Sequence, residues 1–217
     1  WYMVYVQLEP APLEGYTTQL AESDDLLRWK PLGTILPRGE EAAWDRANAA
    51  GGIALFDPAW DGSHGLQAHD GRYWMSYIGG RGYGYEAVPL SIGLASTADP
   101  SAPLHWSKAA APILTTTDRD VRPGETGTLY KSYIFVDDAK SLGARFVMFY
   151  NAKYKNGYER IGMAASKDMI HWQRLGTNCV VANGEDKRNG ITGDPQIVRM
   201  GDLWVMFYFG AGWKPKA

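Results

Sequence analysis

Three acidic residues lie in similar local sequences, and together they have the chemistry of an acid–base site. Asp57 and Asp194 are each followed by proline, and Glu125 lies between Gly124 and Thr126. Each precedes a run of apolar residues, so we expect each near the start of a strand. Glycosidic hydrolysis uses two carboxyl groups: one protonates the leaving oxygen, and the other activates water or attacks the anomeric carbon. Carboxylates held close together also raise the pKa of one of them, which keeps an acid protonated near neutral pH.

The same residues have a structural interpretation. Asp-Pro commonly opens a turn, and an aspartate can accept backbone N–H bonds between two elements. Taken alone, Asp57 and Asp194 fit that interpretation better than a chemical one. Glu125 fits it less well, because Gly-Glu-Thr-Gly has no obvious turn role. Arg122 and Lys131 are close enough in sequence to pair with these carboxylates, or they are simply solvated.

Aromatic and basic residues in the expected loops are candidates for sugar binding. Sugar rings present apolar C–H faces that stack on aromatic side chains, while most other aromatics of the chain are expected to pack inside sheets. The predicted substrate-binding residues are Lys131, Arg122, Trp60, His64 and Tyr83, and further loop aromatics are Trp44, Tyr85, Tyr154 and Tyr158. The four histidines show no metal-ligand spacing, so we predict no metal site and no cofactor.

Composition excludes several classes of protein. The 217 residues include 9 Trp, 13 Tyr and 25 Gly, which favours short strands, tight turns and aromatic surfaces. Net charge is −2 without a basic run, so nucleic acid is not an expected partner. No apolar run approaches the ~18–20 residues of a membrane span, and no signal peptide is visible. Cys179 is the only thiol, so no intrachain disulfide can form, and we interpret it as a small buried hydrophobe.

An internal repeat organises the chain. The tripeptide Met-x-Tyr recurs at Met3–Tyr5, Met75–Tyr77, Met148–Tyr150 and Met206–Tyr208. The spacing of roughly 60–75 residues suits a four-stranded blade with loops. The last copy belongs to a predicted β-hairpin from Gly190 to Tyr208, with its turn at Gly201-Asp202.

A second pattern follows each of the first three Met-x-Tyr copies. Alternating residues end at a Ser/Thr-x-Asp turn, and a tryptophan then opens another short strand; the copies run from Leu20 to Trp29, from Leu94 to Trp106 and from Met163 to Trp172. In such turns we expect the short polar side chains to bond their own backbone.

These repeats predict an all-β protein, a five-bladed β-propeller built from four-stranded antiparallel blades. About three to four blades are expected in a single domain over residues 1–217, in units of roughly 1–50, 51–120, 121–185 and 186–217. The first strand of the first blade is expected to be missing, and the chain to be incomplete at both ends. The pattern over Glu40–Ala50 fits a helix, a single turn or a loop. Because inner strands surround the axis, the three carboxylates are predicted to share one mouth of the channel.

The pattern Ala-x-Ser-x-Asp-x-x-x-Trp, at Ala21–Trp29 and Ala164–Trp172, resembles the blade signature of five-bladed glycoside hydrolases. These are the families numbered 32, 43, 62, 68, 117 and 130, and family 43 looks most similar. Asp-Pro followed by an apolar strand and a Met-x-Tyr strand, at Asp57–Tyr77 and Asp194–Tyr208, is similar to their pattern between blades. The resemblance covers essentially the whole chain.

The resemblance implies an Asp general base, an Asp that tunes the pKa, and a Glu general acid on successive blades. By position Glu125 matches the acid, and Asp57 and Asp194 match Asp positions. The aspartate of the first blade would precede Trp1, so the base is expected outside this chain. The resemblance also implies a carbohydrate substrate and a secreted or periplasmic protein, and it allows a structural calcium.

We therefore expect a glycosidase, retaining or inverting, that acts on plant or algal-type polysaccharide fragments. A carboxyl separation of about 5 Å would indicate retention, and about 6.5–9.5 Å inversion. Two other functions stay open. One is a carbohydrate-binding propeller without catalysis. The other is a glycoside phosphorylase, for which Arg119, Arg122 and Lys131 would have to form a cationic pocket.

Overall fold

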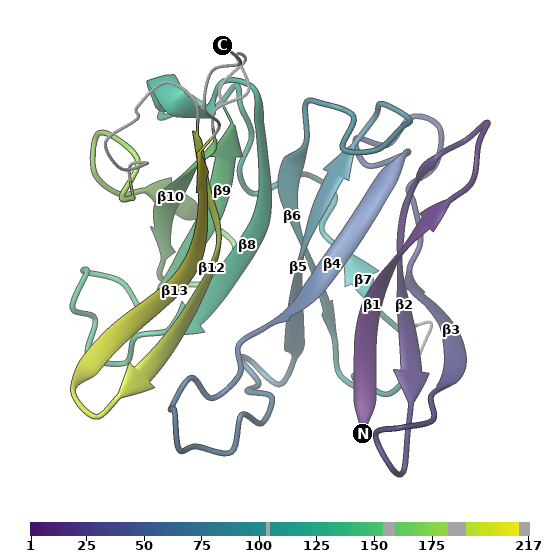
Figure 1. The fold of residues 1–217 in the computed structure, drawn as a ribbon, viewed down its shortest axis with the longest axis horizontal. Helices are drawn as coiled ribbons and strands as arrows, with labels where there is room; N and C mark the ends of the chain where they lie inside the picture. Colours follow the sequence, from purple (N-terminus) through teal and green to yellow (C-terminus); the bar gives the residue numbers. More distant parts are fainter. Residues whose placement is uncertain (103–104, 154–158, 182–189, 213–217) are drawn as a thin grey trace. The chain divides into compact units, whose positions relative to one another are not determined.

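The computed structural model describes residues 1–102, 105–153, 159–181 and 190–212, and the predicted all-β fold is confirmed (Figure 1). The chain forms two compact units: unit 1 is Trp1–Leu55 with Leu66–Pro112, and unit 2 is Phe56–Gly65 with Ile113–Ala217. Tyr154, Tyr158 and most of the polar stretch before Gly193 lie outside the described residues.

Unit 1 consists of two antiparallel sheets. One has three strands in the order β1-β2-β3, and the other has four in the order β4-β5-β6-β7 (Figure 1). Their bounds are β1 Tyr2–Glu9, β2 Gly15–Glu22, β3 Lys30–Leu36, β4 Asn48–Ala54, β5 Tyr73–Gly80, β6 Ser91–Thr97 and β7 Ser107–Lys108. Within each sheet a strand pairs with the next one in sequence, as strands do in a propeller blade.

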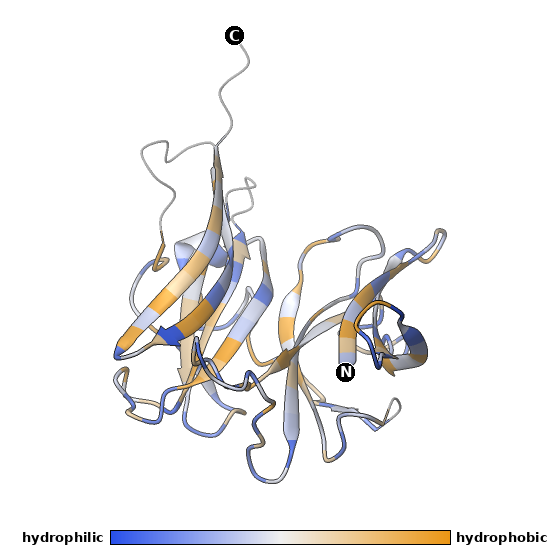
Figure 2. Ribbon diagram, turned by 60° about the horizontal axis from the view of Figure 1, so that its bottom comes forward, coloured by the Kyte–Doolittle hydropathy of each residue, from blue (hydrophilic) through white to orange (hydrophobic). Residues whose placement is uncertain are grey.

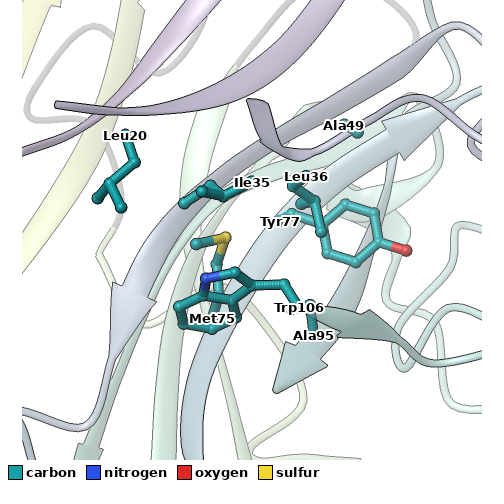
Figure 3. Close-up of a cluster of buried hydrophobic side chains, with 8 residues drawn as sticks. All are labelled: Leu20, Ile35, Leu36, Ala49, Met75, Tyr77, Ala95 and Trp106. Atoms are coloured by element: carbon teal, nitrogen blue, oxygen red, sulfur yellow. The ribbon is translucent and has the colours of Figure 1, made fainter. Parts of the chain in front are cut away.

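The core of unit 1 joins these two sheets. Its buried members come from both: Leu20, Ile35, Leu36, Ala49, Met75, Tyr77, Ala95 and Trp106 (Figure 3). Trp44, predicted as a loop aromatic available to sugar, instead packs against this cluster, with its ring centroid 5.4 Å from that of Tyr77. Burial of large aromatic and aliphatic side chains is the main stabilising contribution in such a layer.

Unit 2 contains one six-stranded sheet, which consists of a four-stranded antiparallel part and a long hairpin paired to it. The four-stranded part comprises β8 Thr128–Val136, β9 Phe146–Lys153, β10 Glu159–Ser166 and β11 Trp172–Arg174, and a 3₁₀ turn, η1 Pro123–Glu125, precedes it. The hairpin comprises β12 Gly190–Met200 and β13 Leu203–Gly212, with the predicted turn at Gly201-Asp202. Hydrophobic and hydrophilic residues follow one another in bands along its strands (Figure 2). It joins the four-stranded part through one parallel bridge, between Glu159 and Ile191.

The predicted Ser/Thr-x-Asp turns have the expected backbone bonds. The Asp168 N–H donates to Ser166 Oγ at 3.2 Å, and Asp168 Oδ1 accepts the N–H groups two and three residues later. Trp172 Nε1 donates to the carbonyl of Met169, which has a φ of 69°. The copy at 23–29 repeats these bonds. The turn is therefore built from local side-chain bonds, as the sequence pattern predicts.

One part of the predicted organisation is wrong. Residues 41–47 form turns and bends, and they lead into β4, which was not expected as a strand. β4 reads Asn-Ala-Ala-Gly-Gly-Ile-Ala, and alanine and glycine have low β-propensity. It is a strand because β5 pairs with it along its whole length, from Asn48–Gly80 to Ala54–Trp74. Tertiary pairing here overrides local preference.

A glycine lies opposite the anchor tyrosine in each four-stranded sheet, and these positions yield a test of stability. Gly93 pairs with Tyr77 and Gly162 with Tyr150; an added Cβ would lie 2.7 and 2.5 Å from the respective tyrosine rings. Gly93→Ala and Gly162→Ala should each lower the free energy of unfolding by about 1–3 kcal/mol through overpacking.

Gly52→Ala is the matched control, because a Cβ there meets nothing within 4 Å. Its effect should stay within about 0.5 kcal/mol. Urea denaturation measures all three variants. If Gly93→Ala and Gly162→Ala were as stable as Gly52→Ala, the tyrosine rings would not be tightly held.

Candidate active site

The three predicted carboxylates all belong to unit 2, but they do not occupy equivalent places. Glu125 ends η1 and lies three residues before β8, near the start of a first strand as predicted. Asp57 does not: β4 has already ended at Ala54, and Asp57 lies in the loop that follows. Asp194 lies inside β12, at a β-bulge. The prediction of three equivalent strand starts is therefore correct for Glu125 only.

Asp57 caps its own loop. Its Oδ1 accepts the N–H of Ala59 at 3.1 Å, and its Oδ2 accepts the N–H and Oγ of Ser63 at 3.0 and 3.2 Å. The N–H of Ala59, followed by that of Ser63, lowers the pKa of Asp57 below its usual value. These contacts match the structural interpretation, since both oxygens are used within the loop. A catalytic role for Asp57 stays a prediction.

Two predicted sugar-binding residues lie on the same loop. Trp60 is exposed and stacks on Phe207 of β13, with ring centroids 6.0 Å apart and planes at 26°. His64 has a φ of 51°, and its charge contributes to lowering the pKa of Asp57. A bridge between Ala59 and Arg199 holds the loop against β12.

Glu125 is held in a closed network and is 2% exposed. Its Oε1 accepts the hydroxyl of Tyr150 at 2.7 Å, and its Oε2 accepts Arg174 Nε at 2.5 Å and the N–H of Arg122 at 3.3 Å. Arg122 Nη1 lies 3.6 Å from Oε1. Burial, and then the charge of Glu125, raises the pKa of the Tyr150 hydroxyl well above its ordinary value. Tyr150 is thus a neutral donor at any working pH.

Arg174 is the residue at the centre of this network, and it was not predicted. Its side chain is fully buried, and besides Glu125 it donates to Asp118 Oδ2 at 2.9 Å, to Asp120 Oδ1 at 2.7 Å and to the carbonyl of Thr115 at 2.6 Å. The polar loop that contains these acceptors is therefore tied to β11. A charge without partners at this depth would cost several kcal/mol.

Unit 1 contains a counterpart of this arrangement around Asp45, which was also not predicted. Asp45 is 3% exposed, and its Oδ2 accepts the hydroxyl of Tyr77 at 3.1 Å and Lys108 Nζ at 2.6 Å. As in unit 2, the carboxylate precedes the first strand, the tyrosine lies on the second and the cation on the fourth. We call the two sets, Asp45–Tyr77–Lys108 and Glu125–Tyr150–Arg174, the carboxylate–tyrosine–cation clusters.

The sequence contains a pattern that could have predicted the cations of these clusters. Both cations come two residues after the tryptophan of the repeated turn, in Trp106-Ser107-Lys108 and Trp172-Gln173-Arg174. Asp45, and not Asp57, is the counterpart of Glu125. It was missed because the Ala- and Gly-rich β4 was not recognised as the first strand of its sheet.

Asp194 has a different environment, because its side chain is 43% exposed. Asn151 Nδ2 donates to Asp194 Oδ1 at 3.1 Å, and the N–H of Asp194 donates to Asn151 Oδ1 at 2.8 Å. Lys131 Nζ lies 3.1 Å from Oδ1 and 3.2 Å from Oδ2. Asn151 itself is fully buried, so a rigid side chain of β9 orients the carboxylate.

The backbone at this pair is strained on both sides. Lys131 lies at a bulge of β8 with a φ of 50°, and Asp194 lies at a bulge of β12 with a φ of 53°. Each left-handed residue costs on the order of 1–3 kcal/mol, whereas a half-exposed ion pair contributes only about 0–1 kcal/mol. Left-handed φ values also occur at other non-glycine residues, among them Met169 in the repeated turn, so this conformation by itself does not mark a functional site.

The structure therefore joins Lys131 to Asp194 and Arg122 to Glu125. Asp57, Trp60 and His64 form a separate loop of unit 2. Tyr83 belongs to unit 1, where the Arg46 guanidinium lies 5.5 Å from its ring centroid. A single hollow shared by all three carboxylates stays a prediction.

Within the described ranges, no group of three or more His, Cys, Asp and Glu side chains could hold a metal ion. In the same ranges, no helix has the length and apolar character needed to cross a membrane.

Comparison with known proteins places this arrangement in a class. No protein-family model matches the chain, and no curated protein sequence matches it. Among solved structures, one described as a glycoside hydrolase aligns with a TM-score of 0.88 and 45% identity, covering 97% of this chain and 62% of its own. A family 117 glycoside hydrolase of the marine bacterium Zobellia galactanivorans aligns with a TM-score of 0.58 and 14% identity, covering 96% and 62%.

The class is that of β-propeller proteins whose solved structural neighbours are glycoside hydrolases, which confirms the resemblance stated from the sequence. A thermostable family 43 glycoside hydrolase is among them, with a TM-score of 0.56 and 15% identity over 95% of this chain and 64% of its own. The protein spans 62% of the glycoside hydrolase to which it is 45% identical.

The closed network around Glu125 yields a second test. Arg174→Met should lower the free energy of unfolding by about 3–5 kcal/mol, because it leaves Glu125 buried without its cation. The double variant Glu125→Met with Arg174→Met should recover part of that loss, since the isolated charge is then gone. Urea denaturation measures both.

Arg145→Met is the control, because Arg145 forms an ion pair with Asp138 in which its own side chain is 45% exposed. It should cost no more than about 1 kcal/mol. A double variant that is no more stable than Arg174→Met would mean that the unpaired carboxylate is not the cause.

Proposed function

We propose that this protein hydrolyses glycosidic bonds in an oligo- or polysaccharide, with Asp194 as the carboxylate that faces the substrate. Two facts support the proposal together: the 45% identity to a glycoside hydrolase over 97% of the sequence, and the geometry of Asp194. The geometry supports it, because the Asp194 side chain is 43% exposed and is held by Asn151, whereas Glu125 is 2% exposed and both oxygens of Asp57 accept hydrogen bonds within its own loop.

The surroundings of Asp194 suit a carboxylate that activates water or stabilises positive charge at the anomeric carbon. Asn151 donates one hydrogen bond to the carboxylate and accepts one from the main-chain N–H of Asp194, and Lys131 compensates the negative charge. The side chain of Asp194 is 43% exposed. A catalytic group has to be held in position before substrate arrives, and here the fully buried Asn151 holds it.

Glu125 is the proposed general acid, on the strength of its place before β8 and of the resemblance. The geometry supports this role less than it supports that of Asp194, since Tyr150, Arg174 and the N–H of Arg122 occupy both oxygens. The contacts alone favour a structural role in positioning the start of β8. The two roles differ in how strongly the rate depends on the leaving group.

The proposed substrate is a plant or algal-type polysaccharide fragment. A solved structure with 45% identity is described as a complex of BT0996 with RGII, which supports a carbohydrate ligand. Phosphorolysis is the less favoured reaction, because two of the three cations that would bind phosphate already serve carboxylates: Lys131 pairs with Asp194 and Arg122 with Glu125.

Asp194→Asn tests the proposal directly. On a panel of aryl glycosides, turnover should fall by about 10²- to 10⁴-fold, because the amide can neither take up a proton nor stabilise the developing positive charge. Asp202→Asn, at the tip of the same hairpin, should leave turnover unchanged. Thermal denaturation verifies that both variants are folded. Binding of sugars without release of the aryl group by the parent protein would favour the carbohydrate-binding alternative.

Glu125→Gln separates a general acid from a structural residue. Loss of a general acid should reduce hydrolysis by about 10²- to 10⁴-fold for a poor leaving group and far less for an activated one such as dinitrophenolate. A structural defect would instead lower both rates alike, together with the melting temperature. Equal losses on the two substrates would therefore remove Glu125 from the chemical step.

A further inference from the structure

A cavity of about 340 Å³ lies on unit 2, and none of its lining residues belongs to the proposed catalytic site. Two parts of the chain form it: residues 142–144, between β8 and β9, and residues 165–168, 171–173 and 175, in and around the repeated turn before β11. The volume falls in the range of small-molecule sites, about 300–1,000 Å³. It is large enough for one sugar ring.

Part of the wall is apolar and rigid. Leu142, Ala165 and Leu175 contribute aliphatic groups, and Trp172 contributes a partly exposed indole. Trp172 Nε1 is already bonded to the carbonyl of Met169 at 2.7 Å, so the ring is fixed. A fixed aromatic with aliphatic neighbours suits the C–H face of a sugar.

The rest of the wall offers hydrogen-bonding groups. His171 Nδ1 is 2.8 Å from Asp168 Oδ2, which orients the ring and leaves Nε2 available to a ligand. The hydrogen bond from His171 is the largest cause that lowers the pKa of Asp168, so this acceptor stays ionised. Lys167 and Gln173 are exposed, and within the described part of the protein their side chains make no hydrogen bond.

The repeated turn does not need these polar groups. The copy at 23–29 makes the same backbone bonds with Arg28 in the place of His171. Arg28 Nε lies 3.9 Å from Asp25 Oδ2, and the side chains of Arg28 and His171 are both largely exposed, at 93% and 87%. Asp24 takes the place of Lys167, and Lys30 that of Gln173. The backbone bonds of the turn are therefore structural, and the polar side chains that line the cavity are not needed to form them.

We propose that this cavity is a second carbohydrate-binding site, which takes one ring of an oligosaccharide apart from the bond that is cleaved. The ring's apolar face would lie on Trp172, and its hydroxyls would bond His171, Lys167 and Gln173. The proposal rests on the proposed function for its choice of ligand class. A site of this kind would keep a polymer on the enzyme between cleavage events.

An immobilised array of arabino-, galacto- and galacturono-oligosaccharides tests the site on the full protein. We expect binding to at least one of these classes. His171→Ala and Gln173→Ala should each weaken that binding by about 3- to 10-fold, the effect of one lost hydrogen bond. Both side chains are exposed, so the variants should fold, which circular dichroism verifies.

Arg28→Ala is the matched control from the other copy of the turn, and it should leave array binding unchanged. The measurement is repeated in Asp194→Asn protein. If His171→Ala weakens array binding both in the parent protein and in Asp194→Asn protein, the second site is supported, even if the parent protein hydrolyses nothing. No binding to the array, or an equal loss in Arg28→Ala, overturns it, whether or not the protein is a hydrolase.

Discussion

Neutralisation of a buried carboxylate is the constraint on which the two four-stranded sheets depend. Glu125 and Asp45 are 2% and 3% exposed, and each lies just before the first strand of its sheet. A carboxylate at that depth is tolerated only with a cation and further hydrogen bonds. Each carboxylate therefore binds a tyrosine of the second strand and a cation of the fourth strand. These contacts connect three parts of one sheet through a single buried charge. Replacing any member would leave another without its partner.

This constraint bears on the site because β8 follows directly after Glu125 and carries Lys131 at its bulge. With the strand's start held by Tyr150 and Arg174, the bulge has a defined place at which Lys131 meets Asp194. The two carboxylates differ in their surroundings. Glu125 is enclosed and holds the start of β8, whereas Asp194 is half-exposed and accepts a hydrogen bond from Asn151.

The repeated Ser/Thr-x-Asp turn keeps the same backbone hydrogen bonds while its exposed side chains differ from copy to copy. Its backbone bonds are internal, so the exposed positions are free to change without loss of the turn. In unit 1 the residue before the tryptophan is Arg28 in one copy and His105 in the other, and both are exposed. In unit 2 it is His171, held by Asp168 at the wall of a cavity. Function can be added to such a unit at little structural cost.

By itself, the sequence determined what rests on local signals. The Met-x-Tyr and Ser/Thr-x-Asp patterns defined the blade repeat, and Gly201-Asp202 defined the hairpin turn. The order of strands followed from them. All of these features depend on residues a few positions apart in the sequence. It also placed Glu125 correctly before β8. The tertiary structure alone decided that β4 is a strand, that Asp45 and not Asp57 corresponds to Glu125, and that the side chain of Asp194 is half-exposed. Arg174 reaches Glu125 across 49 positions and Lys108 reaches Asp45 across 63, and such partnerships exist only once strands have paired.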